Sequence, residues 1–304
     1  MSSTRLDLSH VRFRGLVRNG GRPVRHFPPP APRPVESEER LDEFVAWVLM
    51  RSGLKVSAYR THPLHRRLPA CLRQLKVPST AAARELLESR PALLQVALNA
   101  FLIGVTEFFR EPAVFDQLQT YLQKLAAQRR RPLRVWSAAC STGAELYSVA
   151  ILLAEAGLLE QSLLLGTDCR PDAVAEARRP QFDLPQWNAA ETARRSKYFE
   201  PIGQRWRPIE AVRQRTHWKV ADLLAGMEAG PWDIVLWRNA AIYLKPQVAE
   251  ATWRGLASTL EPSGLLVTGK AERPPRDLGL APLGRCLYGR WPLLDAILPL
   301  DSSR

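Results

Sequence analysis

The sequence is poor in the residues that build metal sites and disulfide frameworks. Its four cysteines are scattered without a Cys-x-x-Cys pair, and its five histidines are dispersed. No apolar stretch reaches the roughly 20 residues that a membrane-spanning helix needs. Charged residues precede any apolar run at the N-terminus, unlike in a signal peptide. We therefore expect no metal, no membrane insertion, a reducing compartment and a cytoplasmic location.

The excess of positive charge is concentrated at one end of the chain. The formal net charge is +13, and residues 1–35 contribute +6 of it through seven arginines and one aspartate. This segment includes the proline-rich run 28–34, which favours extended conformations and cannot build a core. We expect 1–35 to be a disordered basic tail on a monomeric protein whose body is much less basic.

A basic tail suggests a nucleic-acid partner as one hypothesis. Salt-dependent binding to random duplex DNA would support it. The tail lacks the interleaved aromatic side chains that stack on bases. We therefore predict no specific nucleic-acid partner.

The spacing of apolar residues divides the rest of the chain into two regions. From Leu41 onward a helical spacing predicts a helix that begins near Glu38, followed by helices over 63–75, 80–88, 91–103 and 112–127. After 129–131, short apolar runs at 133–139, 163–166, 232–237 and 264–268 alternate with helical stretches. This alternation predicts a parallel sheet with ligands at the C-terminal strand ends. The sequence thus predicts an all-helical domain at 38–128 and an α/β domain at 129–300.

Polar residues follow the apolar runs at these strand ends. The turn at 141–143 has a single glycine, which argues against the three-glycine fingerprint of a nicotinamide dinucleotide site. Asp168 ends the second run, where a carboxylate can accept hydrogen bonds from ribose hydroxyls. Asp168 is equally well placed to cap the helix that begins near Pro171. The spacing alone does not separate these two roles.

Three motifs in this order resemble the CheR family of S-adenosylmethionine-dependent glutamate methyltransferases. They are TEFFREP at 106–112, WSAACSTGAELYS at 136–148 and RNAAIYL at 238–244. Weaker matches are GTD at 166–168, KYF at 197–199 and LLVTGKAE at 265–272. The resemblance extends from about residue 38 to 275.

The resemblance implies a Rossmann-like methyltransferase domain with a small β insertion, preceded by an all-helical N-terminal domain. It also implies S-adenosyl-L-methionine as cofactor and the cytoplasmic domain of a methyl-accepting chemotaxis receptor as partner, methylated on glutamate side chains. Turn residues between β-formers predict the insertion as a hairpin within 200–209. Pro201 and Pro208 limit its strands, so we do not expect it to tether a receptor peptide.

Individual site residues are implied only where this chain matches the family motifs. Arg110 and Tyr243 resemble the residues beside the sulfonium and the accepting carboxylate, and are the implied catalytic residues. Arg110 could instead pair with Glu107 or Glu111 on a solvated face. The implied cofactor-binding residues are Thr106, Arg110, Glu145, Asp168, Asp222, Leu223, Asn239 and Ala240.

The chain departs from the family pattern in four places. The family usually has Asn where Gly104 and Asp222 stand, Glu where Ala144 stands, and G-x-S-E where Lys270-Ala271 interrupts the motif. The Gly104 change removes one hydrogen bond to the cofactor, worth about 1 kcal/mol or more. An alternative hypothesis is therefore a catalytically weakened cofactor-binding or scaffold protein in a chemosensory pathway, which saturable methyl transfer would exclude.

A basic segment lies at residues 60–76. Its apolar residues recur at helical spacing, which predicts a stripe of basic side chains facing solvent. The resemblance implies that Arg66, Arg67 and Arg73 dock an acidic receptor helix bundle. The alternative is a solvated face without a partner, which is common for a bare run of charge.

Overall fold

The computed structural model describes residues 41–102, 107–128, 132–183 and 189–290. The expected tail at 1–35, Gly104 and Thr106 lie outside the described residues. So does the segment 129–131, where the expected domain boundary falls. The division into domains at 38–128 and 129–300 therefore stays a prediction.

The described chain begins with helices, as the apolar spacing predicts. The first helix starts at Glu43 and not near Glu38, because Asp42 caps it: its Oδ1 accepts hydrogen bonds from the Phe44 and Val45 N–H groups at 2.9 and 3.3 Å. The helices are α1 (Glu43–Arg51), η1 (Val56–Ala58), α2 (Thr61–His65), α3 (Leu68–Leu75), α4 (Thr80–Ser89), η2 (Pro91–Leu93), α5 (Leu94–Phe101) and α6 (Pro112–Gln128).

The helix expected over 63–75 is two helices, and that prediction was wrong. α2 ends at His65, α3 begins at Leu68, and Arg66 and Arg67 lie in the break. Pro69 occupies the first turn of α3, where a residue without an N–H is tolerated, but it cannot continue a preceding helix. The basic side chains are therefore presented by a helix–turn–helix rather than by one straight stripe.

The second half of the described chain contains a seven-stranded sheet in the order β5-β2-β1-β6-β7-β9-β8. The first five strands in this order are parallel, and the last two pair antiparallel. The order reverses between β1 and β6, which opens a crevice at their C-terminal ends. The strands are β1 (Arg134–Ala138), β2 (Leu163–Asp168), β5 (Thr216–Val220), β6 (Trp232–Trp237), β7 (Leu260–Thr268), β8 (Ala281–Gly284) and β9 (Leu287–Gly289).

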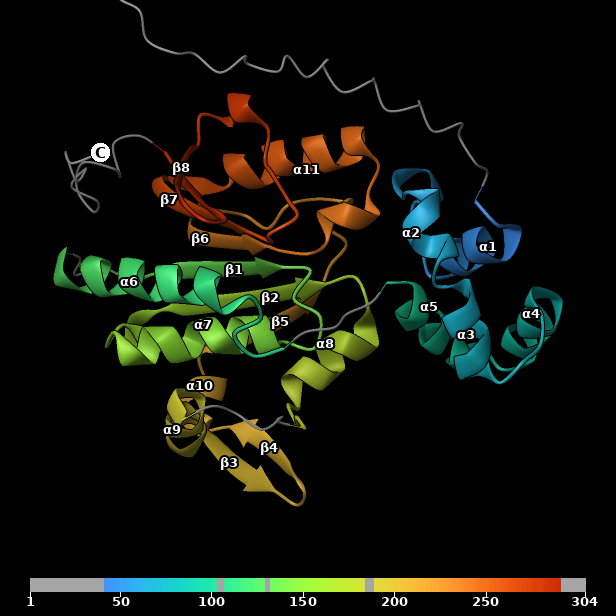
Figure 1. The fold of residues 1–304 in the computed structure, drawn as a ribbon, viewed down its shortest axis with the longest axis horizontal. Coiled ribbons are helices and arrows are strands. Elements are labelled where there is room, and N and C mark those ends of the chain that lie inside the picture. Colours follow the sequence, from blue (N-terminus) through green and yellow to red (C-terminus); the bar gives the residue numbers. More distant parts are fainter. Residues whose placement is uncertain (1–40, 103–106, 129–131, 184–188, 291–304) are drawn as a thin grey trace, which may run out of the picture. The chain divides into compact units, whose positions relative to one another are not determined.

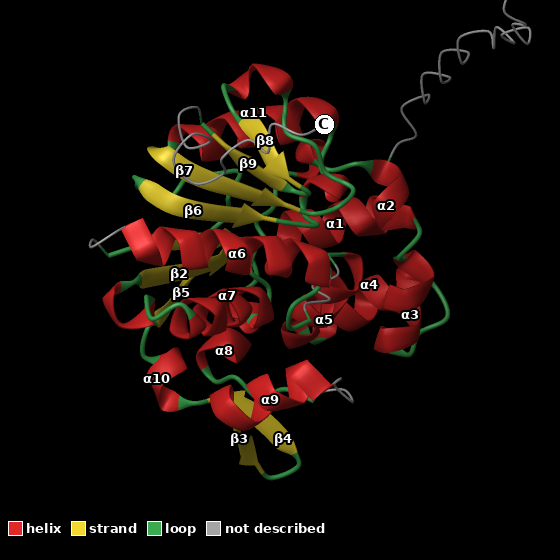
Figure 2. Ribbon diagram, turned by 60° about the vertical axis from the view of Figure 1, so that its left-hand side comes forward, coloured by secondary structure: helices red, strands yellow, loops and turns green. Residues whose placement is uncertain are grey.

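Alternate residues of the central strands face two different cores. Ile234 and Leu236 of β6 pack with α6 and α7 (Ala144–Glu155), whereas Val235 and Trp237 pack with α11 (Pro246–Ser258) and the N-terminal helices. Figures 1 and 2 show α6 and α7 together, with α11 across the sheet from them. Burial on both faces explains why these strands read as continuous apolar runs. The expected α/β, Rossmann-like fold class is confirmed.

The expected β insertion is also present. β3 (Phe199–Ile202) pairs antiparallel with β4 (Arg205–Pro208) as a two-stranded sheet of its own. On the other side of β4, Phe182 and Trp206 exchange two backbone hydrogen bonds of 2.8 and 3.0 Å. The remaining elements are η3 (Leu159–Gln161), α8 (Pro171–Arg178), α9 (Ala189–Tyr198), α10 (Glu210–Arg213), η4 (Ala241–Tyr243) and η5 (Arg276–Leu278).

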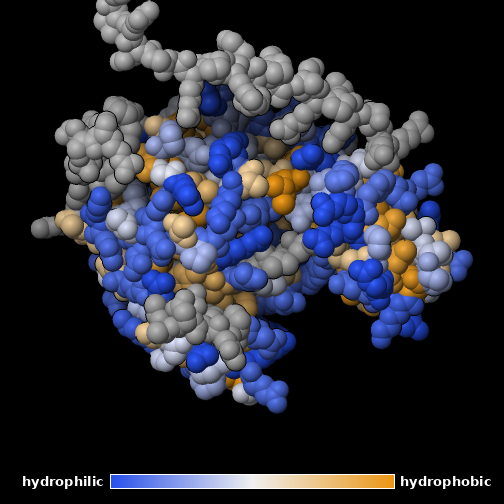
Figure 3. Space-filling model, in the orientation of Figure 1, coloured by the Kyte–Doolittle hydropathy of each residue, from blue (hydrophilic) through white to orange (hydrophobic). Residues whose placement is uncertain are grey.

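The surface carries few large apolar side chains. Figure 3 shows a mostly hydrophilic face, with apolar residues in small groups. Met50 and Ile242 are among the exposed apolar residues, at 61% and 38%. In the part of the chain that the structure describes, no helix has both the length and the apolarity to cross a membrane.

Candidate functional site

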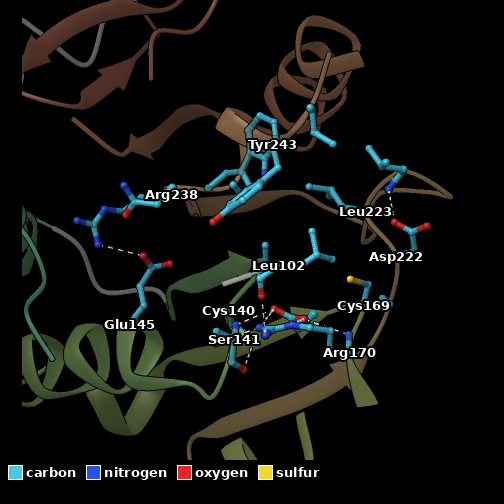
Figure 4. A pocket seen from close by; sticks show the side chains of 18 of the residues that line it. Leu102, Cys140, Ser141, Glu145, Cys169, Arg170, Asp222, Leu223, Arg238 and Tyr243 are labelled. Carbon is cyan, nitrogen blue, oxygen red and sulfur yellow. Dashed lines mark hydrogen bonds and ion pairs between the residues drawn. The ribbon is translucent and has the colours of Figure 1, made fainter. Parts of the chain in front are cut away.

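A pocket lies where β1, β2, β5 and β6 end. Its volume is about 1010 Å³ when the open mouth is included. In Figure 4, Tyr243 lies across the pocket from Cys140, Ser141 and Arg170. The predicted site residues that line it are Arg110, Glu145, Asp168, Asp222, Leu223, Asn239, Ala240 and Tyr243. Thr106 lies outside the described residues, and Arg66, Arg67 and Arg73 do not line the pocket.

The loops around the pocket hold several residues in the left-handed backbone region. This region is unfavourable for residues with a Cβ, and such residues gather at functional sites. Two of them flank Arg110 and three line the pocket. They are Phe109, Glu111, Ala139, Ser141 and Asn239, with φ of 54°, 63°, 60°, 53° and 58°.

Asp168 lies at the end of β2 with both carboxylate oxygens engaged. Oδ1 accepts from the N–H and Nε of Arg170, each at 3.0 Å, and Oδ2 accepts from the Ser141 N–H at 2.8 Å and Arg170 Nη2 at 3.3 Å. A carboxylate has about four acceptor positions, so these donors fill them. Asp168 is not the N-cap of α8, because Arg170 occupies that position. A ribose hydroxyl would need one of these donors to move.

Arg170 connects this carboxylate to the N-terminal helices. Its Nη1 donates to Asn99 Oδ1 and to the Leu102 carbonyl, both at 3.2 Å, and its Nη2 donates to Ser141 Oγ at 3.0 Å. Burial by itself would lower the pKa of Arg170, but the adjacent Asp168 carboxylate leaves this pKa raised. The guanidinium therefore stays charged and fixes the pocket wall beside Asp168.

Arg238 joins the pocket wall at Glu145 to the loop that carries Arg110. Its Nη1 donates to Glu145 Oε2 at 3.0 Å, and its Nη2 donates to the Arg110 carbonyl at 2.6 Å and to Glu111 Oε2 at 3.1 Å. Glu145 Oε1 accepts from Ser137 Oγ at 2.8 Å. The Arg238 side chain is only 1% exposed. One buried guanidinium thus sets the position of two predicted site residues.

Glu272 holds the loop that carries Asn239. Its carboxylate accepts from the backbone N–H groups of Asn239, Ala241 and Gly269 at 2.7, 2.8 and 2.9 Å. Burial raises the pKa of Glu272, and these hydrogen bonds oppose that rise. A Cβ at Gly269 would lie 2.7 Å from Asn239 Nδ2, so the close approach requires glycine.

Asp222 and Leu223 follow β5 and line the part of the pocket wall at the end of that strand. Asp222 Oδ1 accepts from the Leu224 N–H at 2.9 Å, and Oδ2 has no partner among the described residues. Leu223 and Leu224 are apolar lining residues beside it. This part of the pocket wall can therefore pack against a flat apolar group and accept one hydrogen bond from it at Asp222 Oδ2.

Tyr59 brings the N-terminal helices into the pocket wall. The segment around it pairs with the end of η4: the Arg60 N–H donates to the Tyr243 carbonyl at 2.8 Å, and the Lys245 N–H donates to the Ala58 carbonyl at 2.9 Å. Burial, followed by the nearby Cys169 and the carboxylates of Asp222 and Asp168, raises the pKa of Tyr59 well above its ordinary value. Tyr59 is thus a neutral phenol at physiological pH.

Sequence reasoning missed four residues of this site. Arg238 and Glu272 lie inside the quoted motifs, so the motifs themselves were the available signal. Arg170 stands two residues after Asp168, where only the spacing could have drawn attention to it. No sequence feature near Tyr59 predicts its place in the site, because that place depends on the bridge between Tyr59 and Leu244, which lie 185 residues apart in the sequence.

The residues of the pocket fit S-adenosylmethionine, a cationic nucleoside. Glu145 keeps acceptor capacity beside its two partners and can bind an ammonium group. Asp222 Oδ2 is available to an adenine amino group next to the leucine wall. Within the described ranges, no three side chains of His, Cys, Asp or Glu lie close enough together to hold a metal ion. Asp168 fits the ribose only if Arg170 releases an acceptor position.

Comparison with known proteins identifies the family. Residues 104–279 match the family model described as CheR methyltransferase, SAM binding domain. The probable biofilm formation methyltransferase WspC of Pseudomonas putida is 34% identical over 62% of this chain, but the match covers only 46% of that protein. The chemotaxis protein methyltransferase of Listeria monocytogenes is 27% identical, over 78% of this chain and 91% of that protein. Chemotaxis protein methyltransferase 2 of Pseudomonas aeruginosa is 30% identical, over 73% and 81%.

The family match covers the strands and loops that form the pocket. It includes Arg110, the turn after β1, the ends of β2 and β5, and the loop after β6. The cofactor of this family's domain is S-adenosylmethionine. The chain belongs to the CheR family of S-adenosylmethionine-dependent chemotaxis methyltransferases.

Proposed function

We propose that the chain is a protein-glutamate O-methyltransferase that acts on the cytoplasmic domains of methyl-accepting chemotaxis receptors. The observation that carries the proposal is that Arg110 and Tyr243 both line the pocket that fits the cofactor. A cation and a phenol hydroxyl are suited to orient an incoming carboxylate. The chemotaxis methyltransferases of Listeria and Pseudomonas aeruginosa to which the chain is similar support a role in chemotaxis.

The reaction places few acid–base demands on the protein. When bound, S-adenosylmethionine supplies an electrophilic methyl group on a sulfonium. A glutamate side chain is already ionised at neutral pH, so no residue has to remove a proton from it. The tasks left to the protein are to orient the carboxylate, to exclude water and to hold the reactants in line. Arg110 and Tyr243 perform the first of these.

Separate carboxylates hold the two ends of the cofactor. We assign Glu145 to the ammonium group of the methionine part, because Arg238 and Ser137 hold its carboxylate in place at the pocket wall. Asp222 and Leu223 are assigned to the adenine, and Asn239 and Ala240 to the neighbouring wall. Asp168 is assigned to the ribose, with a shift of Arg170 when the hydroxyls bind. Thr106 keeps its predicted cofactor role, although it lies outside the described residues.

The receptor is proposed to approach over the turn between α2 and α3. Arg66, Arg67 and Arg73 are exposed there, and no acidic side chain among the described residues forms an ion pair with them. An acidic helix bundle would be drawn to these charges over a distance set by the Debye length.

The proposal is tested by methyl transfer from radiolabelled S-adenosylmethionine to purified chemoreceptor cytoplasmic domains. We expect saturable incorporation of label that mild alkali releases as methanol, because carboxyl methyl esters are base-labile. Arg110→Ala and Tyr243→Phe should lower kcat more than the affinity for S-adenosylhomocysteine, the pattern of groups that act in the transition state. Tyr288→Phe in β9, outside the pocket, is the matched control.

Two outcomes would overturn the proposal. Label that survives alkali would show that another group than a carboxylate is methylated. Cofactor binding without transfer to any receptor domain would favour the alternative of a cofactor-binding or scaffold protein. If Arg110→Ala and Tyr243→Phe both keep wild-type kcat, the two assigned roles are wrong even where methyl transfer occurs.

A further inference from the structure

A second cavity lies beside η4 and shares Leu244 with the cofactor pocket. Its volume is about 940 Å³ with its mouth included. η4, the N-terminal half of α11 and the loop after β7 form its walls. We call it the η4 groove, and define it by Arg60, Ile242, Pro246, Ala249, Trp253 and Arg273.

The η4 groove begins one residue away from the proposed catalytic tyrosine. Ile242 lines the groove and Tyr243 lines the cofactor pocket, while Leu244 lines both. The Arg60 N–H donates to the Tyr243 carbonyl at 2.8 Å, so Arg60 is tied to the same short helix. A chain that lies in this groove would therefore pass close to Tyr243, the residue assigned to the acceptor carboxylate.

The rim of the η4 groove carries two arginines, Arg60 and Arg273, beside two carboxylates that already have partners. Arg254 binds Glu250 at 2.8 Å, and Glu272 accepts three backbone N–H hydrogen bonds. Arg273 Nη1 donates to two backbone carbonyls, both at 2.9 Å. No acidic side chain of the described residues forms an ion pair with Arg60 or Arg273. The groove is thus complementary to a ligand that brings carboxylates of its own.

The floor of the η4 groove is apolar. Ile242 is 38% exposed, one of the few large apolar side chains that the described surface presents to solvent. Ala249 and Pro246 lie beside it, and Trp253 closes the bottom with 3% exposure. An apolar floor between two cations matches an amphipathic helix whose apolar side is flanked by acidic residues.

We propose that the η4 groove binds the receptor helix that carries the acceptor glutamate. This inference rests on the proposed function. The apolar side of the helix packs on Ile242 and Ala249, and carboxylates on its flanks meet Arg60 and Arg273. Residues three or four apart lie about 5–6 Å from each other on one helix face, so a neighbouring glutamate on the same face is within reach of Tyr243. The groove thereby selects glutamates that have acidic neighbours about one turn away.

The test compares two groove variants with matched controls elsewhere on the surface. Ile242→Asp and Arg273→Glu should raise the KM for a purified chemoreceptor cytoplasmic domain by about fivefold or more, as expected for a central interface residue. Their affinity for S-adenosylhomocysteine should match that of the wild type, because neither residue lines the cofactor pocket. Met50→Asp and Arg84→Glu, on α1 and α4, are the controls and should leave the KM unchanged.

A direct binding measurement separates this inference from the proposed function. The probe is a synthetic fluorescent helix with leucines on one side and glutamates on both flanks, and the readout is anisotropy with the full chain. Ile242→Asp should weaken its binding about fivefold or more, and Met50→Asp should not. Loss of probe binding in Ile242→Asp, with no methyl transfer even by the wild type, would support the groove and refute the methyltransferase proposal. Wild-type methyl transfer with unchanged KM and unchanged probe binding in both groove variants would refute the groove alone.

Discussion

Replacement of Arg238 by methionine is the sharpest test of how the pocket is held together. Methionine keeps an unbranched apolar side chain in place of the guanidinium, which packs 5.0 Å above the Phe115 ring. The change removes two ion pairs and the bond to the Arg110 carbonyl. It leaves Glu111 and Glu145, at 15% and 14% exposure, without their cation. Loss of one partner of a buried ion pair is destabilising by about 3–5 kcal/mol.

The matched control is Arg84→Met on α4, which removes one surface ion pair and a cation–π contact with Trp47 at 5.3 Å. Arg84 and Glu88 are 53% and 52% exposed and 3.0 Å apart, so the expected loss is about 0–1 kcal/mol for the ion pair and about 0.5–1 kcal/mol for the cation–π contact. Each kcal/mol lowers the Tm of a domain of this size by about 2–4 °C, so Arg238→Met should lower the Tm by about 6–20 °C. Arg238→Lys should fall between the two, because it keeps the charge but loses the planar fork. Equal Tm values for Arg238→Met and Arg84→Met, measured by calorimetry, would refute the assigned role of Arg238.

Three further predictions concern Asp168, Glu272 and the basic turn between α2 and α3. Asp168→Asn should weaken S-adenosylhomocysteine binding by about 1–3 kcal/mol in titration calorimetry, whereas Asp183→Asn, at an exposed residue that pairs with Arg205 of the hairpin, should not; equal affinities would show that Asp168 does not bind the ribose. Burial raises the pKa of Glu272 above its ordinary 4.5, so the folded chain binds this proton more tightly than the unfolded chain. The contribution of Glu272 to stability therefore grows as the pH falls from above the raised folded pKa to below 4.5. The urea midpoint of the wild type, relative to that of Glu272→Gln, should rise as the pH falls through this window. The Arg66→Glu, Arg67→Glu double variant should show a higher KM for the receptor with unchanged cofactor affinity, and the wild-type KM should rise with salt. Kinetics that do not depend on salt would show that this turn is a solvated face without a docking role.

The sheet was predictable where its strands are buried on both faces. The four apolar runs predicted as strands became β1, β2, β6 and β7, because two cores demand apolar side chains at consecutive positions. β5, β8 and β9 were missed. β5 has one buried residue among its five, and β8 has none, so neither shows a continuous apolar run. Edge strands are defined by their neighbours rather than by their own sequence.

The site was predictable where a side chain lies at or just after the end of a strand. Asp168 ends β2 and Asn239 follows β6 by two residues, and both line the pocket. Arg170 was missed because its importance arises from contacts with Asn99 and Leu102, about 70 residues earlier. The split of 63–75 into two helices turned on Pro69, which a periodicity of apolar residues does not register. Periodicity thus locates elements, whereas the contacts between elements decide which polar residues meet.

The pairing of residues 58–60 with 243–245 couples the stability of the N-terminal helices to cofactor binding. Tyr59 contributes to the pocket wall while its neighbours exchange backbone hydrogen bonds with the end of η4. A ligand that binds only the folded pocket stabilises every segment whose folding the pocket needs. Saturation with S-adenosylhomocysteine should therefore slow amide hydrogen exchange at Arg60, far from the cofactor in sequence, as well as at Lys245. Cofactor binding would then also stabilise the basic turn at Arg66 and Arg67, which only the short helix α2 separates from this segment.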